Sequence, residues 1–388
     1  MEIFKSIEEN LLTVIMFWSI FLFSILIAWI YQKKRVTYSS EGNIVIKKID
    51  KVTDFLWVLI IIIGPSLLIG LRAYDVGADT SNYVNSYLNI EYYNSALENF
   101  KLSGMDRPLF WLLRHIVYIL SNANATIFLC VMAILTLFIL VKGMQKWIDK
   151  YSLPSMLFIY YCIFGMQLIN QSRQMLALSI FFYSLYYLFQ NKNKKYLLCI
   201  LLAGLIHYTA FIGIIIYFLR FNDNGYLKFK QNIIYLIVIS MPIIIPFILP
   251  IIISVLSKVL PRSYRVYLNN ITYTEIGWGL FLTIFPIVIS IILYKKYLRC
   301  YFGQYLIRIS VLAIIFRVAA YYSYFLMRMS YYGVIVVILI TELIGSKFKL
   351  RSNKIIVKGS LYIVFMAYYI LNYMHLYKDV FFPYYSIL

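Results

Sequence analysis

Long apolar runs separated by short charged clusters make up most of the chain. The runs from Leu11 to Tyr31, from Asp54 to Leu71 and from Asn232 to Leu256 can each cross a hydrocarbon layer about 30 Å thick, because a helix rises about 1.5 Å per residue. Lipid offers no hydrogen-bond partners, so a spanning segment must pair its own backbone groups, and the sequence lacks the alternating pattern of a barrel. The pattern therefore predicts an all-α, polytopic integral membrane helix bundle of about 11–13 transmembrane helices, with residues 1–388 as a single transmembrane domain.

Clusters of lysine and arginine between the runs predict the orientation of the bundle. Basic residues are retained on the cytoplasmic side, so the cluster from Lys33 to Lys51 places the amino terminus outside. Residues 73–125 then form the largest external loop, which holds five of the 16 acidic residues. The apolar stretch Pro108–Leu120 within this loop is predicted to be a re-entrant or interfacial helix, because counting it as a span would place Lys192 to Lys195 outside.

The same charge rule predicts the remaining spans. They are expected near residues 126–141, 153–170, 173–189, 233–253, 278–294, 303–322, 324–345 and 355–375. The apolar segment 196–219 must turn near His207, as a broken helix beside a polar cavity, if the basic residues after it are to stay in the cytoplasm. Residues 254–277 become a second external loop with Arg262 and Arg265. Positive charge outside violates the rule, and it indicates either a site for an external anion or contact with lipid headgroups.

Composition excludes several other classes of protein. Hydrophobic residues make up 62% of the chain and charged residues 13%, whereas a soluble domain has about 25% charged residues. The net charge of +20 is spread over short clusters between spans, so no nucleic acid is expected as a partner. The four cysteines lie in or beside apolar runs without a paired spacing, so neither disulfides nor a metal site is expected.

The first polar constellation lies at the outer end of the second span, in the stretch Arg72–Tyr83. Asp75 and Asp79 are four residues apart and can share one face of a turn beside an arginine. Removal of a proton from a sugar hydroxyl needs a carboxylate near the acceptor, and a guanidinium binds a carboxylate or phosphate through paired bonds. Asp79 is the favoured base and Asp75 the second choice. The alternative is a solvated loop whose helix is capped by Asp79 or Thr80.

A second polar group, Asn170–Gln174, interrupts a long apolar stretch. A cation at membrane depth costs a few kcal/mol unless it finds a partner or water, and such cations by default mark a substrate path. Arg173 is therefore predicted to bind substrate, with Gln174 beside it. The alternative is a tight turn between two spans whose arginine reaches the headgroups.

Three further polar residues lie within apolar spans. A single histidine there more often bonds another helix than acts as a catalyst, so His207 is predicted to position substrate. Arg317 and Arg328 flank a predicted external junction, where they join the other outer arginines in a cluster suited to a diphosphate. The predicted members of this cluster are Arg72, Arg173, Arg262, Arg265, Arg317 and Arg328. Outer tyrosines such as Tyr83 can support sugar rings, although interfacial belts explain most such aromatics.

Three short motifs occur in order along the chain. They are Arg72–Tyr83 with Gly77 and Asp79, Arg173-Gln174 with Ala177, and Ala203–Ala210 with His207. Together they resemble the EpsG/Wzy-type family of exopolysaccharide, O-antigen and capsule repeat-unit polymerases, over about residues 55–385. Weaker matches are Arg328 ahead of Tyr331 and Tyr332, and Pro383-Tyr384. Asp106 stands where the family often shows a glutamate, so no catalytic role is assigned to it.

The resemblance implies a membrane glycosyltransferase that moves a growing glycan from undecaprenyl diphosphate to a new lipid-linked repeat unit. The reaction would take place on the outer face of the bacterial cytoplasmic (inner) membrane. Arginines would bind the diphosphate and a carboxylate would act as base. The expected partners are the lipid-linked oligosaccharide, the growing glycan and the bilayer, with a flippase and a chain-length regulator as further candidates. No cofactor is expected, and the sequence has no glycine-rich phosphate loop.

Other functions remain open on the sequence alone. A lipid-linked oligosaccharide flippase or another transporter would also need cationic residues in a cavity, together with charges at mid-membrane depth and internal repeats. A membrane acyltransferase would need a second polar histidine near His207. A purely structural membrane protein would leave Arg173, Arg317 and Arg328 unexplained.

Overall fold

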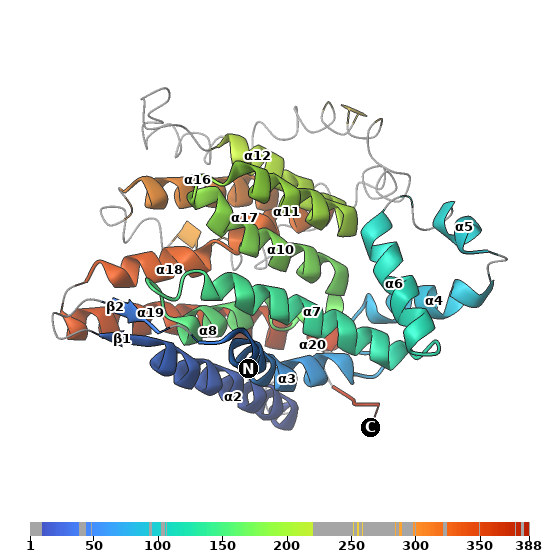
Figure 1. Ribbon diagram of the computed structural model, residues 1–388, viewed down its shortest axis with the longest axis horizontal. Coiled ribbons are helices and arrows are strands. Elements are labelled where there is room, and N and C mark those ends of the chain that lie inside the picture. Colours follow the sequence, from blue (N-terminus) through green and yellow to red (C-terminus); the bar gives the residue numbers. More distant parts are fainter. Residues whose placement is uncertain are drawn as a thin grey trace. The chain divides into compact units, whose positions relative to one another are not determined.

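The computed structural model describes residues 10–38, 44–92 except Lys48, 95–101, 105, 107–219, 300–320, 324–348, 350–376, 378–381 and 384–387, with isolated positions between 251 and 298. These residues are almost wholly helical, with one short hairpin (Figure 1). They fall into two compact units, each described by itself. Unit 1 holds residues 1–207 and 348–388, and unit 2 holds residues 208–347. The predicted all-α polytopic bundle is confirmed.

Long apolar helices form the body of unit 1. They are α2 (Leu11–Arg35), α3 (Lys51–Gly70), α7 (Ala125–Gln145), α8 (Leu153–Phe164), α10 (Ser172–Phe189), α11 (Asn193–Ile206) and α19 (Arg351–Tyr369). The buried residues of α2 show how they pack, because Phe17, Phe21, Ser24, Ala28 and Tyr31 repeat at helical spacing on one face. Helix α2 packs against α3 and α8, and α10 packs against both α7 and α11.

Short elements join these helices at both ends of unit 1. They are α4 (Thr80–Leu88), η1 (Asn89–Tyr92), α5 (Ala96–Asn99), α6 (Pro108–Leu120), α9 (Gln167–Asn170), η4 (Ile370–Leu376) and α20 (Lys378–Phe381). Strands β1 (Val36–Tyr38) and β2 (Ile44–Ile46) pair antiparallel, with Val36 opposite Ile46. This hairpin was not predicted, because three-residue strands are too short to show the alternation by which a strand is recognised.

Unit 2 is also helical. It contains η3 (Tyr208–Phe211), α12 (Ile212–Phe218), α16 (Tyr301–Ala319), α17 (Tyr324–Val334) and α18 (Val337–Ser346). Helix α16 packs along α17, and Tyr305 of α16 donates a hydrogen bond to the carbonyl of Ile216 in α12. The buried Tyr332 of α17 lies 3.3 Å, oxygen to oxygen, from the hydroxyl of Thr209.

Six helical segments in the described part of the chain are long and apolar enough to cross a membrane. They are Leu11–Arg35, Lys51–Gly70, Ala125–Gln145, Tyr301–Ala319, Phe325–Ser346 and Ser352–Met374. Large apolar side chains on the outside of α2, including Leu12 (84% exposed) and Phe23 (54% exposed), would be costly in water but are suited to lipid. The chain is a multi-pass membrane protein.

The structure shows a short helix and a helix break at two places where the sequence predicted them, while the re-entrant or interfacial position of the short helix stays a prediction. The stretch Pro108–Leu120 is a separate helix with those bounds, and its 13 residues are too few to span a bilayer. The segment after Asn193 breaks at His207, which is extended (φ −150°, ψ 115°) and ends α11. The expected span 153–170 is split into α8 and α9. Nearly all of the expected spans 233–253 and 278–294 lies outside the described residues, as do Arg262 and Arg265.

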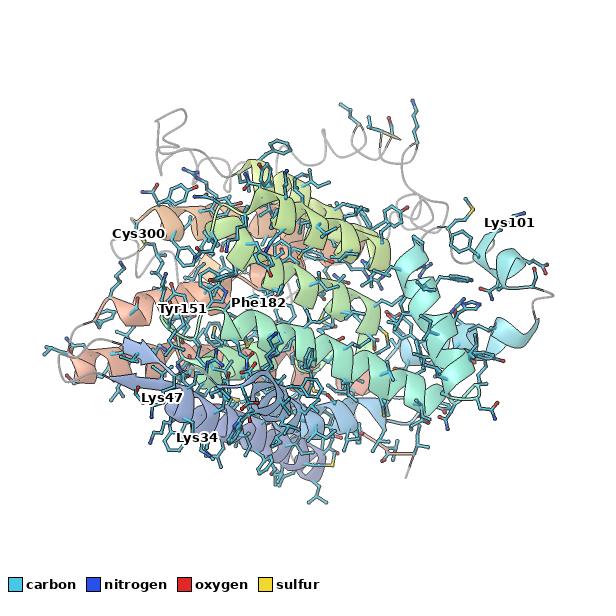
Figure 2. All side chains as sticks on the ribbon, viewed as in Figure 1. Lys34, Lys47, Lys101, Tyr151, Phe182 and Cys300 are labelled. Atoms are coloured by element: carbon cyan, nitrogen blue, oxygen red, sulfur yellow. The ribbon has the colours of Figure 1, made fainter. Side chains whose placement is uncertain are left out.

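An ionic cluster ties three helices together at the end of unit 1 that the basic residues predict to be cytoplasmic. The Asp54 carboxylate pairs with Arg35 (3.0 Å) and with Lys142, and it accepts a hydrogen bond from Tyr31 Oη (2.5 Å). Lys34 and Lys47 lie at this end of the unit, whereas Lys101 of the predicted external loop lies at the opposite end (Figure 2). The predicted inner and outer segments therefore occupy opposite ends of unit 1.

Asp54→Ala is expected to lower the free energy of unfolding by about 1–3 kcal/mol, because it leaves two half-buried cations without their counter-ion. The measurement is thermal or denaturant unfolding in detergent. Asp50→Asn is the control, because the exposed Asp50 only caps α3 through the Thr53 amide and asparagine also caps well. Equal destabilisation by the two substitutions would contradict this account of the cluster.

Candidate functional site

Four segments of unit 1 meet at its predicted outer end. They are the 71–79 loop after α3, the start of α4, the break between α9 and α10, and the side of α6 that carries Phe110. Helices α4, α5 and α6 lie together at the right of Figure 1. The amide of Asp79 donates to Asn170 Oδ1 (2.8 Å), which joins the start of α4 to the α9–α10 break. The first two sequence motifs, 100 residues apart, are thus brought together.

Arg72 is completely buried inside this junction. Its Nε donates to Thr80 Oγ1 (3.1 Å), its Nη2 to Ser172 Oγ (3.5 Å), and its Nη1 to the carbonyl of Ile69. Burial lowers the pKa of the Arg72 guanidinium to about 10, so the group is still charged at neutral pH. One side chain thus connects the end of α3, the start of α4 and the start of α10.

The loop after Arg72 turns sharply at Gly77. This residue has φ +89°, in the left-handed region where other L-residues are strained. A Cβ atom there would lie 2.9 Å from Thr80 Oγ1 and 3.2 Å from Ile169 Cγ2. Glycine is therefore required for α4 to start close against α9.

Gly77→Ala is expected to lower the free energy of unfolding by about 1–3 kcal/mol, because alanine is strained at this φ and its Cβ would press on Thr80 and Ile169. The control is Gly359→Ala in α19, where an added Cβ meets nothing within 4 Å and alanine favours the helix. Unfolding of the purified variants in detergent is the measurement. Equal stability of Gly77→Ala and the wild type would show that the turn does not need glycine.

The two candidate carboxylates lie in different surroundings. Asp79 is half-buried at the N-cap position of α4, but its side chain makes no capping hydrogen bond, so the predicted alternative role as a cap is not seen. Asp75 is exposed on the loop. Asp79 lies one helical turn before Tyr83, whose amide donates to the Asp79 carbonyl (3.1 Å).

Arg173, near the start of α10, lies between two aromatic rings. Its guanidinium carbon is 5.0 Å from the centroid of the Tyr83 ring and 5.2 Å from that of Phe110, distances typical of cation–π contacts. Both rings are buried. The Nε atom of Arg173 is also buried, and it has no hydrogen-bond partner among the described residues. A guanidinium held by ring faces keeps N–H donors for an anion, which is a preferred ligand of arginine.

Helix α6 carries Phe110 and is itself fixed by a buried arginine that the sequence analysis did not select. Arg114, one turn after Phe110, donates to the carbonyl and the hydroxyl of Ser86 in α4 and to Asn99 Oδ1 (3.0 Å). Trp111 Nε1 donates to the same oxygen of Asn99 (2.7 Å). The spacing of Phe110 and Arg114 on one face of an otherwise apolar helix is the signal that could have identified this pair.

The other predicted site residues are placed as follows. Gln174 is buried in the first turn of α10, and His207 is buried at the end of α11, both in unit 1. Arg317 is buried in the last turn of α16 and Arg328 is half-buried in α17, both in unit 2. Because the two units are described separately, a single cluster of all six arginines stays a prediction. No group of His, Cys, Asp and Glu residues suited to a metal ion occurs among the described residues.

Comparison with known proteins gives one match. A model of the EpsG family matches residues 55–386, which include most of α3, the 71–79 loop, α6, the α9–α10 break and the pairing of residues 384–386 with that loop. Neither a curated protein nor a solved structure matches the chain.

Proposed function

Because the chain belongs to the EpsG family, a Wzy-type family of polysaccharide polymerases, we propose that it joins undecaprenyl-diphosphate-linked oligosaccharide repeat units into a surface polysaccharide. The reaction takes place on the outer face of the bacterial cytoplasmic membrane. The observation that carries the proposal is the guanidinium of Arg173, which lies between two buried rings with a buried Nε that lacks a partner among the described residues. This arrangement suits a phosphate or diphosphate oxygen.

In the proposed reaction, a hydroxyl at the non-reducing end of the new repeat unit attacks the anomeric carbon of the growing glycan. A C–O bond forms to the sugar hydroxyl oxygen, and the bond between the anomeric carbon and the diphosphate oxygen breaks. The electron pair of the broken bond stays on the diphosphate, which Arg173 stabilises. The proton of the attacking hydroxyl passes to the carboxylate of Asp79 as general base.

The remaining residues have supporting roles in this proposal. Arg72 positions the loop that leads to Asp79, and Gln174 and His207 help to position substrate. Tyr83 holds Arg173 and can also support a sugar ring. Arg317, Arg328, Arg262 and Arg265 are the further diphosphate-binding candidates that the sequence predicts. Asp75 is the second choice for the base.

The test is purified protein incubated with lipid-linked repeat units and resolved by size on a gel. A ladder with steps of one repeat unit is the expected result, and it should disappear when Arg173 is replaced by alanine. Transport of intact lipid-linked units across vesicles without a ladder would instead support the flippase or transporter.

A further inference from the structure

Helix α20 (Lys378–Phe381) and residues 384–387 pair with the loop that holds Arg72. Three backbone hydrogen bonds run from Gly77 N to Val380 O (2.9 Å), from Ala73 N to Tyr385 O (2.8 Å) and from Ile387 N to Leu71 O (2.9 Å). Arg72 and Ser386 thus form an antiparallel bridge, and Ser386 Oγ adds a bond to Leu71 O (3.2 Å). In Figure 1, the end of the ribbon that carries these residues lies beside the end of α3.

Tyr384 anchors this segment to the body of unit 1. Its hydroxyl donates to the carbonyl of Leu68 in the last turn of α3 (2.5 Å), and its ring meets Phe17 of α2 edge-on, with centroids 5.2 Å apart. Burial raises the pKa of Tyr384 to about 12, so the hydroxyl stays protonated and can donate at neutral pH. The segment is therefore held by side chains as well as by backbone.

The pairing matters because the 71–79 loop is the connection that sets where α4 begins. The loop lies between the end of α3 and the helix that carries Asp79 and Tyr83. Its amides at Ala73 and Gly77 are bonded to residues about 300 positions later in the chain. A displacement of a catalytic group by about 1 Å can cost about 100-fold in rate, so a brace on this loop can act on the reaction without touching substrate.

We propose that residues 378–381 and 384–387 are a positioning element of the polymerase site, in which Tyr384 and the backbone amide of Ile387 hold the 71–79 loop. This inference rests on the proposed function. In this proposal, residues 378–381 and 384–387 affect the rate of coupling and do not affect substrate affinity.

Ile387 offers a matched pair of variants. Its side chain is 43% exposed, so Ile387→Ala keeps the amide and removes little packing. Ile387→Pro removes the N–H that donates to Leu71 O. Ile387→Pro is expected to lower kcat for repeat-unit coupling by about tenfold or more with a KM close to that of the wild type, whereas Ile387→Ala keeps both constants.

Substitutions of Tyr384 provide an independent test of the positioning role. Tyr384→Ala should lower kcat as Ile387→Pro does, and Tyr384→Phe, which keeps the ring against Phe17, should recover part of the loss. Tyr385→Ala removes an exposed side chain of the same segment and should leave kcat unchanged. A raised KM with a normal kcat in Tyr384→Ala would overturn the positioning role.

Hydrogen exchange of the purified variants separates this inference from the proposed function. In Ile387→Pro, faster exchange is expected in a peptide covering residues 71–80, with unchanged exchange in α7. Faster exchange with normal kcat would overturn the positioning element while the wild-type ladder still supports the polymerase. Unchanged exchange in the loop would overturn the proposed brace directly, and a wild-type protein that forms no ladder would overturn both.

Discussion

Arg173→Ala is expected to reduce the rate of repeat-unit coupling by about 100-fold or more. The substitution removes a cation whose described contacts are the rings of Tyr83 and Phe110. The leaving diphosphate then loses charge-assisted hydrogen bonds where negative charge develops. Arg173→Lys should keep only part of the activity, because an ammonium neither stacks between rings nor binds phosphate in a bidentate manner.

Lys101 supplies the matched control for Arg173. It is an exposed cation at the same predicted outer end of unit 1, so Lys101→Ala also removes one positive charge there. Polymer length should stay normal in this variant. The measurement is the ladder made by purified protein, together with surface polymer in cells with matched protein levels. A full ladder from Arg173→Ala would exclude this residue from diphosphate binding.

Asp79→Asn is expected to reduce coupling by about 100- to 10,000-fold, the range lost with a general base. Asparagine has nearly the same shape as aspartate and suits an N-cap position equally well, so α4 should still begin at Thr80. The variant should therefore bind lipid-linked units normally but fail to elongate them. Binding to the purified variant and single-turnover coupling are the two measurements.

Asp75→Asn is the comparison that shows whether Asp79 or Asp75 acts as the general base. Asp75 is exposed on the same loop, four residues earlier, and its replacement should change the coupling rate by no more than about twofold. If the large loss appears in Asp75→Asn and not in Asp79→Asn, the base is Asp75. If neither variant loses activity, neither carboxylate of this loop acts in the reaction.

Local patterns in the sequence predict the helical part of this protein well. Apolar runs identify α2, α3 and α7, and basic clusters identify Pro108–Leu120 as a separate short helix. The break at His207 follows from the need to keep later cations on one side. These features depend on residues close together in the chain, where periodicity and charge act directly.

Such local patterns do not predict the long-range contacts of the site. Phe110 is one of 28 phenylalanines, and although its spacing from Arg114 marks one face of α6, nothing in the sequence near it indicates that this ring faces Arg173. The bridge between Arg72 and Ser386 joins residues more than 300 positions apart through backbone atoms, which are alike at every residue. Motif resemblance selected Arg72 and Tyr384 separately, but only the three-dimensional structure shows that their segments pair.

The ionic cluster around Asp54 has a consequence for the insertion of the chain into the membrane during synthesis. A chain that enters the membrane as it is synthesised exposes its early helices to lipid before later ones exist. Without Arg35, Asp54 would have no cationic partner from this cluster until Lys142 is made, 88 residues later. Arg35, on the preceding helix, can neutralise it as soon as α2 and α3 form a hairpin. We therefore expect Arg35 to serve as the counter-ion of Asp54 during insertion, before Lys142 of α7 completes the cluster.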